Sequence, residues 1–201
     1  MNKLSVIPVS LLLVALSGHG QGTSFLYDQQ SSTNEGYYGY GSGPAYQSLV
    51  PNTGQSFIPS LSAIDFIRLN LSDGSPGDGL GSTWFLNLRS TTITGPILGT
   101  TAPVDLPDTF IGPANFFFPS TIPLTPGTTY YFDVNSADGG AWHVIAGVFN
   151  YPGGMIWAQG QPNPQGDYWF REGLVVPEPS SAALLLLAGA TLVYFRRAKR
   201  P

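Results

Sequence analysis

Residues 23–176 show no sustained apolar period of 3.6 residues, and this is the strongest constraint on how the chain can fold. Short β-rich runs alternate there with turns, in a chain of 201 residues that contains 25 Gly and 18 Pro. A helix of a globular domain needs a continuous apolar stripe, whereas a half-buried strand needs only a period of two. The sequence therefore predicts an all-β fold.

The clearest alternation runs through residues 83–90, 128–135 and 142–148. Trp84 and Trp142 lie on the apolar faces of these segments, so we expect both in the core, with Val148 on the same face as Trp142. Asp65 interrupts the alternation of its own segment and has no evident place. The expected strands are 24–30, 54–58, 63–71, 83–90, 97–101, 115–118, 128–135, 142–148, 155–159 and 167–171.

About ten short strands separated by turns favour an antiparallel β-sandwich or jelly roll, with a closed β-barrel as the alternative. Residues 31–49 are polar and are expected to form a long loop. The first and last strands, 24–30 and 167–171, are expected to pair or to be neighbours. Pro126-Gly127, with Leu124 before it and an aromatic strand after it, resembles a corner found in many exported β-sandwich modules.

Residues 1–22 have the pattern of a secretory signal peptide. Lys3 precedes an apolar stretch, 4–16, and small residues follow it, so cleavage is expected after Gly20 or Gly22. The alternative is an uncleaved N-terminal anchor, although the apolar stretch is short for a span.

Residues 175–201 have the order of a membrane helix that stops on its cytoplasmic side. Pro177, Glu178 and Pro179 precede an uncharged segment, 182–195, and four cations close the chain: Arg196, Arg197, Lys199 and Arg200. Fourteen helical residues span roughly 21 Å, less than the hydrocarbon core of about 30 Å. A span over 180–195 is feasible if the arginines snorkel; an amphipathic or buried helix is the alternative.

The tripeptide, the short apolar helix and the basic end together resemble the bacterial PEP-CTERM sorting signal. The resemblance implies that an exosortase-type membrane protease cleaves near the tripeptide. It also implies export to the cell envelope or the extracellular polymer, where association with exopolysaccharide is expected. The expected organisation is a signal peptide at 1–22, a β-sandwich at 23–174 and a sorting signal at 175–201. The apolar helix would then hold the chain in the membrane only until processing.

The charge of residues 23–176 excludes several classes of function. This stretch has three arginines, eleven acids and no lysine, so its net charge is −8. Such a surface repels nucleic acid, because nucleic-acid affinity comes mainly from cations that meet phosphate. The chain contains no cysteine, so disulfides and thiolate metal sites are excluded as well.

Three aromatic residues in the last third of the chain are the candidate glycan-facing positions: Tyr151, Trp157 and Trp169. Sugars stack on aromatic faces, and these residues lie near turns, which favours exposure; burial in the core or in a packed rim is the alternative for each of them. Asp73 and Asp78 bracket a glycine-rich loop, where a weak structural calcium site and a plain turn are the two interpretations. No other cofactor is expected.

Catalysis has little support in the sequence. His143 is the one histidine of residues 23–176, and its strand turns it away from the face of Trp142. A Gly-x-Ser-x-Gly elbow is absent from the sequence. We therefore expect a structural or glycan-associated module without catalysis. The alternative is a secreted polysaccharide hydrolase that uses a pair of carboxylates.

Overall fold

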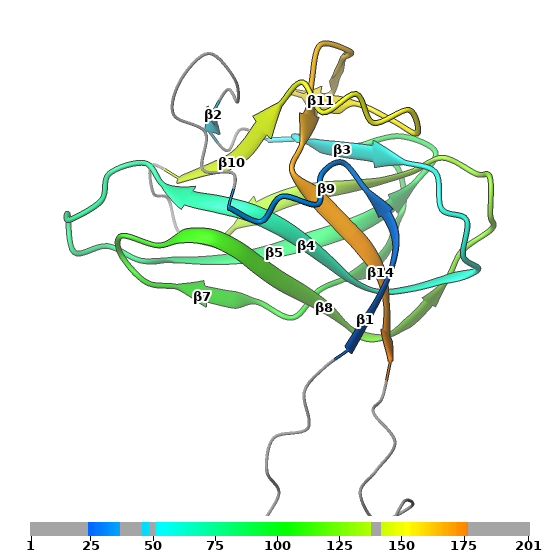
Figure 1. The fold of residues 1–201 in the computed structure, drawn as a ribbon, viewed down its shortest axis with the longest axis horizontal. Helices are drawn as coiled ribbons and strands as arrows, with labels where there is room; N and C mark the ends of the chain where they lie inside the picture. The colour runs from blue at the N-terminus through cyan, green and yellow to red at the C-terminus, as the bar shows by residue number, and fades with distance from the viewer. Residues whose placement is uncertain (1–23, 37–45, 49–50, 138–141, 177–201) are drawn as a thin grey trace, which may run out of the picture. The chain divides into compact units, whose positions relative to one another are not determined.

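The domain between the two ends of the chain is an antiparallel β-sandwich (Figure 1). A computed structural model describes residues 24–36, 46–48, 51–137 and 142–176, and Phe25–Val176 form one compact unit. These residues contain fourteen strands and no helix. The prediction of an all-β sandwich is confirmed, whereas both predicted terminal segments lie outside the described residues.

The first sheet has the order β1-β14-β4-β10-β13, and β8 and β2 pair with β4 and β10. Strand β4 lies at its centre: β8 pairs with β4 along most of its length, and β14 and β10 also pair with β4. The strands are β1 (Ser24–Gln30), β2 (Tyr46–Ser48), β4 (Ala63–Asp73), β8 (Ile111–Pro123), β10 (Trp142–Gly147), β13 (Asp167–Tyr168) and β14 (Phe170–Val176).

The second sheet has the order β12-β11-β3-β9-β5-β6, and β7 pairs with β5. The paired strands β5 and β9 form its centre. The strands are β3 (Gly54–Phe57), β5 (Ser82–Ser90), β6 (Ile97–Thr100), β7 (Val104–Leu106), β9 (Tyr130–Ser136), β11 (Ile156–Ala158) and β12 (Gln161–Asn163).

The core lies between the sheets and is strongly aromatic. Trp84 and Trp142 are both buried, as predicted, with ring centroids 5.9 Å apart. Phe132 of the second sheet meets Phe170 of the first sheet at 5.6 Å. Because the domain has no disulfide, burial of these large side chains is the main source of its stability.

Asp65 lies at a β-bulge, which explains why it breaks the sequence pattern. The register between β4 and β8 shifts between Ile64 and Phe66, so Ile64 and Ile67 both reach the core. The Asp65 carboxylate accepts hydrogen bonds from the Thr121 hydroxyl and from the Val175 backbone N–H. An extra residue in one strand requires such compensation, because it leaves part of the ladder unpaired.

The predicted corner closes through a buried tyrosine. The backbone N–H of Thr125 donates to the Tyr130 hydroxyl at 3.0 Å, and Gly127 takes a φ of 78° in the turn between them. A tyrosine that returns to the backbone a few residues upstream is a known feature of β-sandwich corners.

The sheets approach each other at both edges without closing into a barrel. Ala102 donates a backbone hydrogen bond to Phe117 on β8, and the Gln55 side chain accepts one from Tyr168 of the first sheet. These are single bridges between two sheets and not continuous ladders. The sandwich prediction is therefore preferred over the barrel alternative.

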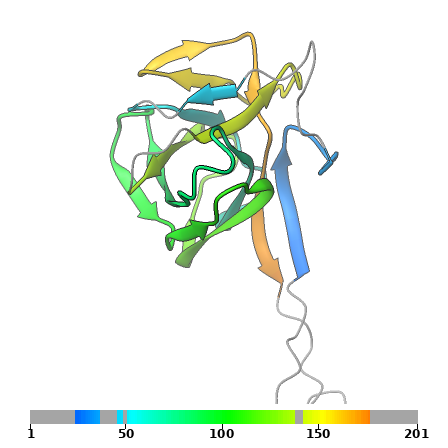
Figure 2. The ribbon, with the colours of Figure 1, turned by 90° about the vertical axis from the view of Figure 1, so that its left-hand side faces the viewer.

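The two ends of the domain lie side by side. Strand β1 neighbours β14, and the two run in opposite directions (Figure 2). The expected pairing of the first and last strands is therefore confirmed. The last strand continues to Val176, so the predicted domain boundary at residue 174 is two residues too early.

Other details of the prediction are wrong. The expected loop 31–49 contains β2, and the three-residue strands β7 and β12 were not predicted. Val148 is 72% exposed because it follows the end of β10 and no longer shares its alternation.

Candidate functional site

The predicted sorting residues cannot be placed on the fold. Pro177, Glu178 and Pro179 lie outside the described residues, as do Arg196, Arg197, Lys199 and Arg200. Within the described residues, no helix is long and apolar enough to cross a membrane. The tripeptide follows directly after the last residue of β14 in the sequence.

Trp169 is a candidate glycan-facing residue by its sequence, but the structure contradicts this interpretation and matches the core alternative. Its side chain is fully buried, and its Nε1 donates to the Asn34 carbonyl at 2.8 Å. The guanidinium of Arg171 lies 5.2 Å from its ring centroid. The segment after β1 therefore covers Trp169, although this segment is distant in sequence and Trp169 lies near a turn.

Tyr151 is also buried, contrary to the prediction. Its hydroxyl donates to Gln29 Oε1 at 3.0 Å and accepts from the Ile58 backbone N–H at 3.3 Å. Its ring meets Phe170 edge-on at 5.1 Å. Burial, with smaller contributions from nearby carboxylates, raises the pKa of Tyr151 to about 12.

Trp157 keeps a partly exposed side chain on the outer face of the second sheet. It lies opposite Gly54, which pairs in turn with Asp133. Because Gly54 has no side chain, the indole reaches over β3 and meets Tyr131 edge-on at 5.4 Å. Of the three predicted glycan-facing residues, Trp157 is the one with a surface that a sugar can contact.

A shallow depression of about 180 Å³ lies between residues 148–154 and 164–167. Its lining includes Tyr151 and one acid, Asp167. Asp167 Oδ1 accepts from the Gln55 side chain and Oδ2 accepts from the Tyr151 backbone N–H, both at 3.0 Å. Burial outweighs these bonds and raises the pKa of Asp167. The depression is smaller than most ligand pockets, which hold about 300–1,000 Å³.

Asp73 and Asp78, the predicted calcium ligands, act as turn acceptors. Asp73 accepts backbone N–H bonds from Ser75 at 2.8 Å and Thr109 at 2.9 Å. Asp78 accepts from Leu80 at 2.8 Å. In the part of the chain that the structure describes, no group of three or more His, Cys, Asp or Glu is placed to hold a metal ion. These contacts match the plain-turn interpretation.

Asp108, which the sequence places in a turn-like context, orders the same glycine-rich loop. Its two carboxylate oxygens accept from the backbone N–H groups of Gly77 at 2.8 Å and Gly79 at 2.9 Å. The bond from Gly77 is the main reason that the pKa of Asp108 is lowered. The loop therefore points N–H groups, and not carbonyls, at its acids.

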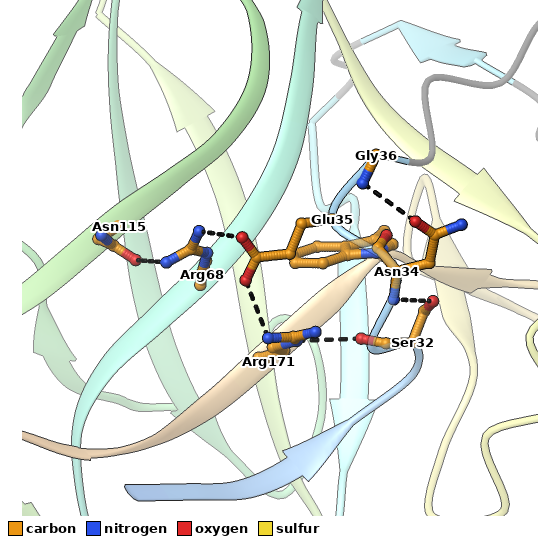
Figure 3. A network of polar contacts seen from close by, with 8 residues as sticks. Ser32, Asn34, Glu35, Gly36, Arg68, Asn115 and Arg171 are labelled. Atoms are coloured by element: carbon orange, nitrogen blue, oxygen red, sulfur yellow. Dashed lines mark hydrogen bonds and ion pairs between the residues drawn. The ribbon is translucent and has the colours of Figure 1, made fainter. Parts of the chain in front are cut away.

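Glu35 joins two arginines of the first sheet (Figure 3). Its carboxylate accepts from Arg68 Nη2 and from Arg171 Nη1, each at 2.9 Å. Arg171 Nε also donates to the Ser32 carbonyl at 3.0 Å, and Arg68 Nη1 donates to Asn115 Oδ1 at 3.4 Å. One carboxylate thus fastens the segment after β1 to both β4 and β14.

The third arginine of the domain, Arg89, is also paired. Its Nη2 lies 3.0 Å from Asp133 Oδ2, and its Nη1 donates to the Gly95 carbonyl at 2.7 Å. All three arginines of residues 23–176 therefore bind the domain itself. Their side chains are at most 16% exposed, so they offer little to an external anion.

Glu172 is a buried acid that was not predicted from the sequence. It is fully buried, and neither carboxylate oxygen has a hydrogen-bond partner among the described residues. Burial, followed by the negative charge of Asp28, raises the pKa of Glu172 to about 9, and the nearby Gln29 N–H opposes this only in part. Glu172 is therefore protonated at neutral pH. Continuing the alternation beyond Arg171 places it on the inward face of Phe170, and this signal was available.

Asp28, whose charge acts on Glu172, has a pKa that is shifted in the opposite direction. Burial alone would raise its pKa, but hydrogen bonds from Leu61 and Ser60 together lower it. Two acids with separated pKa values are typical of acid–base catalysis. Here Glu172 has no exposed surface from which to reach a substrate. His143 lies half-buried on the face away from Trp142, as expected.

Comparison with known proteins adds no family to this description. No protein-family model matches the sequence, and no curated protein matches it either.

The first prediction concerns the proton on Glu172. Between about pH 5 and pH 9 the unfolded chain ionises this acid while the folded chain keeps it neutral, so stability should fall as pH rises. Glu172→Gln removes this dependence. The variant should equal the native chain near pH 4 and exceed its free energy of unfolding at pH 8, by on the order of a few kcal/mol.

Urea unfolding followed by tryptophan fluorescence at several pH values measures this difference. Asp78→Asn, which removes one charge from an exposed loop, is the matched control. A difference between Glu172→Gln and the native chain that stays constant across this pH range would contradict the assignment.

Proposed function

We propose that this chain is an exported, non-catalytic β-sandwich protein of the bacterial cell envelope or extracellular matrix, routed by a PEP-CTERM-type signal. The observation that carries the proposal is the end of β14 at Val176, directly before Pro177. The sandwich uses no residue of the tripeptide or of the apolar segment to complete its described sheets. Cleavage beyond Val176 would therefore leave every described strand of the sandwich intact.

The signal peptide at 1–22 starts export, and the segment 180–195 holds the chain in the membrane while an exosortase-type protease acts near Pro177-Glu178-Pro179. The cations from Arg196 to Arg200 stop transfer on the cytoplasmic side. The destination is the cell surface or the extracellular polymer. The chain has no nucleic-acid partner in this account, because each arginine of the domain is already paired.

A structural role within that destination is favoured by the use of the charged groups. Asp28, Asp73 and Asp108 hold backbone N–H groups of turns, and Glu35 and Asp133 hold arginines. A polysaccharide hydrolase needs two acids that flank the bond to be cleaved. The acid pair with separated pKa values, Asp28 and Glu172, is closed to a polymer by the burial of Glu172.

A glycan-associated form of this role is supported at one place. Trp157 presents part of its indole on the outer face, braced by Tyr131. Exopolysaccharide that stacks on this indole is the binding partner that the chemistry suggests. Calcium is not required at Asp73 and Asp78, because backbone N–H groups already engage both acids.

Replacement of Pro177-Glu178-Pro179 by three alanines tests the sorting proposal. Without the rigid tripeptide the protease is expected not to recognise the chain, so the precursor should remain in the inner membrane at full size. Replacement of Ser180-Ser181 by alanines is the matched control and should leave processing intact. Fractionation and immunoblotting measure both, and unchanged release of the triple-alanine variant would refute the proposal.

A glycan array probed with the full chain, with and without calcium, tests the glycan-associated form. Trp157→Ala should weaken any polysaccharide binding by about threefold to tenfold, because stacking on an aromatic face contributes about 0.5–1.5 kcal/mol. Near-ultraviolet circular dichroism checks that the variant is folded. Absence of binding by the native chain in both conditions would remove this form and leave the structural role.

A further inference from the structure

A second aromatic cluster lies on the outer face of the first sheet, outside the core. It is formed by Phe25 and Tyr27 of β1, Phe66 of β4 and Phe117 of β8. The core residues Ile67, Phe116 and Phe118 flank Phe66 and Phe117 in the chain, so the alternation directs Phe66 and Phe117 to the opposite face. We call these four side chains the outer aromatic cluster.

Gly173 allows the outer aromatic cluster to form across four neighbouring strands. Phe117 pairs with Phe66, Phe66 pairs with Gly173, and the Leu26 carbonyl approaches Gly173 from β1. A Cβ on Gly173 would lie 2.0 Å from that carbonyl oxygen, so a larger residue would push β1 away. The rings of β1 therefore close over a position that has no side chain.

Ring contacts hold the cluster together around Phe66. Phe25 lies 4.7 Å from Phe66 between centroids, Tyr27 lies 5.8 Å from it, and Phe117 lies 6.3 Å from it. Phe66 is fully buried beneath the others. Phe117 is 37% exposed, and Phe25 and Tyr27 are half-buried, so the cluster has a buried floor and an apolar outer surface.

The charge beside this surface is unusual for such an acidic domain. Arg171 lies over the Tyr27 ring at 4.9 Å, and Arg68 and Arg171 share Glu35. Two of the three arginines of residues 23–176 therefore lie next to the cluster, and the carboxylate between them is neutralised. This face repels an anionic surface less than the acid-rich loops do.

The sequence sets how far this surface is from the apolar tail. Val176 lies three residues beyond Gly173, about 10 Å along an extended strand. The uncharged segment begins at Ala182, which six Cα–Cα steps place at most about 22 Å from Val176. A tether this short keeps the effective concentration of the domain near the bilayer very high, so weak contacts become populated.

We propose that the outer aromatic cluster is a membrane-contact face that lays the first sheet against the lipid surface while the C-terminal segment is inserted. Phe25, Tyr27 and Phe117 enter the headgroup region, where aromatic side chains are favoured. This contact positions the Pro177–Pro179 tripeptide at the bilayer surface, where a membrane protease acts. The inference rests on the proposed membrane insertion of residues 180–195.

The absence of cysteine from the chain makes a site-specific test possible, because one introduced thiol is labelled uniquely. Pro119→Cys carries the fluorophore NBD two residues after Phe117, on the same side of β8 by alternation, and leaves all four rings in place. Thr94→Cys, in the exposed connection between β5 and β6 of the other sheet, is the matched control. The full chain is reconstituted in phosphatidylethanolamine–phosphatidylglycerol vesicles that contain doxyl-labelled lipid.

The expected result is that the lipid quencher reduces emission at position 119 severalfold more than at position 94. Adding Phe25→Ser and Phe117→Ser to the Pro119→Cys chain should abolish the difference while the chain still sediments with vesicles. If the chain sediments but both labels are quenched equally, the contact face is refuted and insertion stands. If the chain does not sediment, insertion itself fails, and the contact face falls with it.

One further outcome identifies a different occupant. In this outcome, neither aqueous iodide nor the lipid quencher reduces the emission of the label at position 119, and the emission changes with protein concentration. Such a result would show that a second copy of the chain covers the cluster. That outcome would overturn the proposal.

Discussion

The ion pairs between Glu35 and two arginines are the interaction on which the arrangement of the first sheet depends. Without disulfides, the N-terminal strand and the segment after it must be fastened by burial and charge. Glu35 reaches Arg68 on β4 and Arg171 on β14, and Trp169 is sealed beneath the same segment. An exposed ion pair contributes about 0–1 kcal/mol, but leaving a buried charge unpaired costs about 3–5 kcal/mol. Arg171, only 8% exposed, lies close to the second case.

Other charged groups of the domain are also paired within it or neutralised. Arg89 is paired with Asp133, the exposed acids accept N–H groups of turns, and Glu172 is neutralised by a proton. Among the residues that the structure describes, few charged groups remain to bind or transform a ligand. This is the physical reason for favouring a structural module, and it leaves aromatic surfaces as the places where the domain meets its surroundings.

Much of the fold could be predicted because it depends on local alternation. Strands such as β5, β9 and β10 direct every second side chain into the core, and a period of two is visible in a single sequence. Strands of three residues, such as β7 and β12, are too short to show that period. In the sequence, the bulge at Asp65 is visible only as a break in the alternation of its strand, because the hydrogen-bond partners of Asp65, Thr121 and Val175, are distant in the chain.

The exposure of candidate site residues was harder to predict than the strands. Trp169 and Tyr151 lie near turns, but residues more than 120 positions away cover them. Glu172 lies one residue beyond the predicted strand 167–171, whereas β14 continues five residues beyond that strand, to Val176. Burial is a property of the assembled sheets, so a sequence window reports the face of a residue and not what is packed on that face.

The most direct test of the claim that the charges serve the structure is the free energy of unfolding of Glu35→Gln, compared with Asp78→Asn and the native chain. The substitution keeps the shape of the side chain and removes the charge that neutralises Arg68 and Arg171. The account predicts a loss of about 1–3 kcal/mol for Glu35→Gln and little change for the exposed control. An unfolding free energy for Glu35→Gln that is equal to or higher than that of the native chain would contradict it.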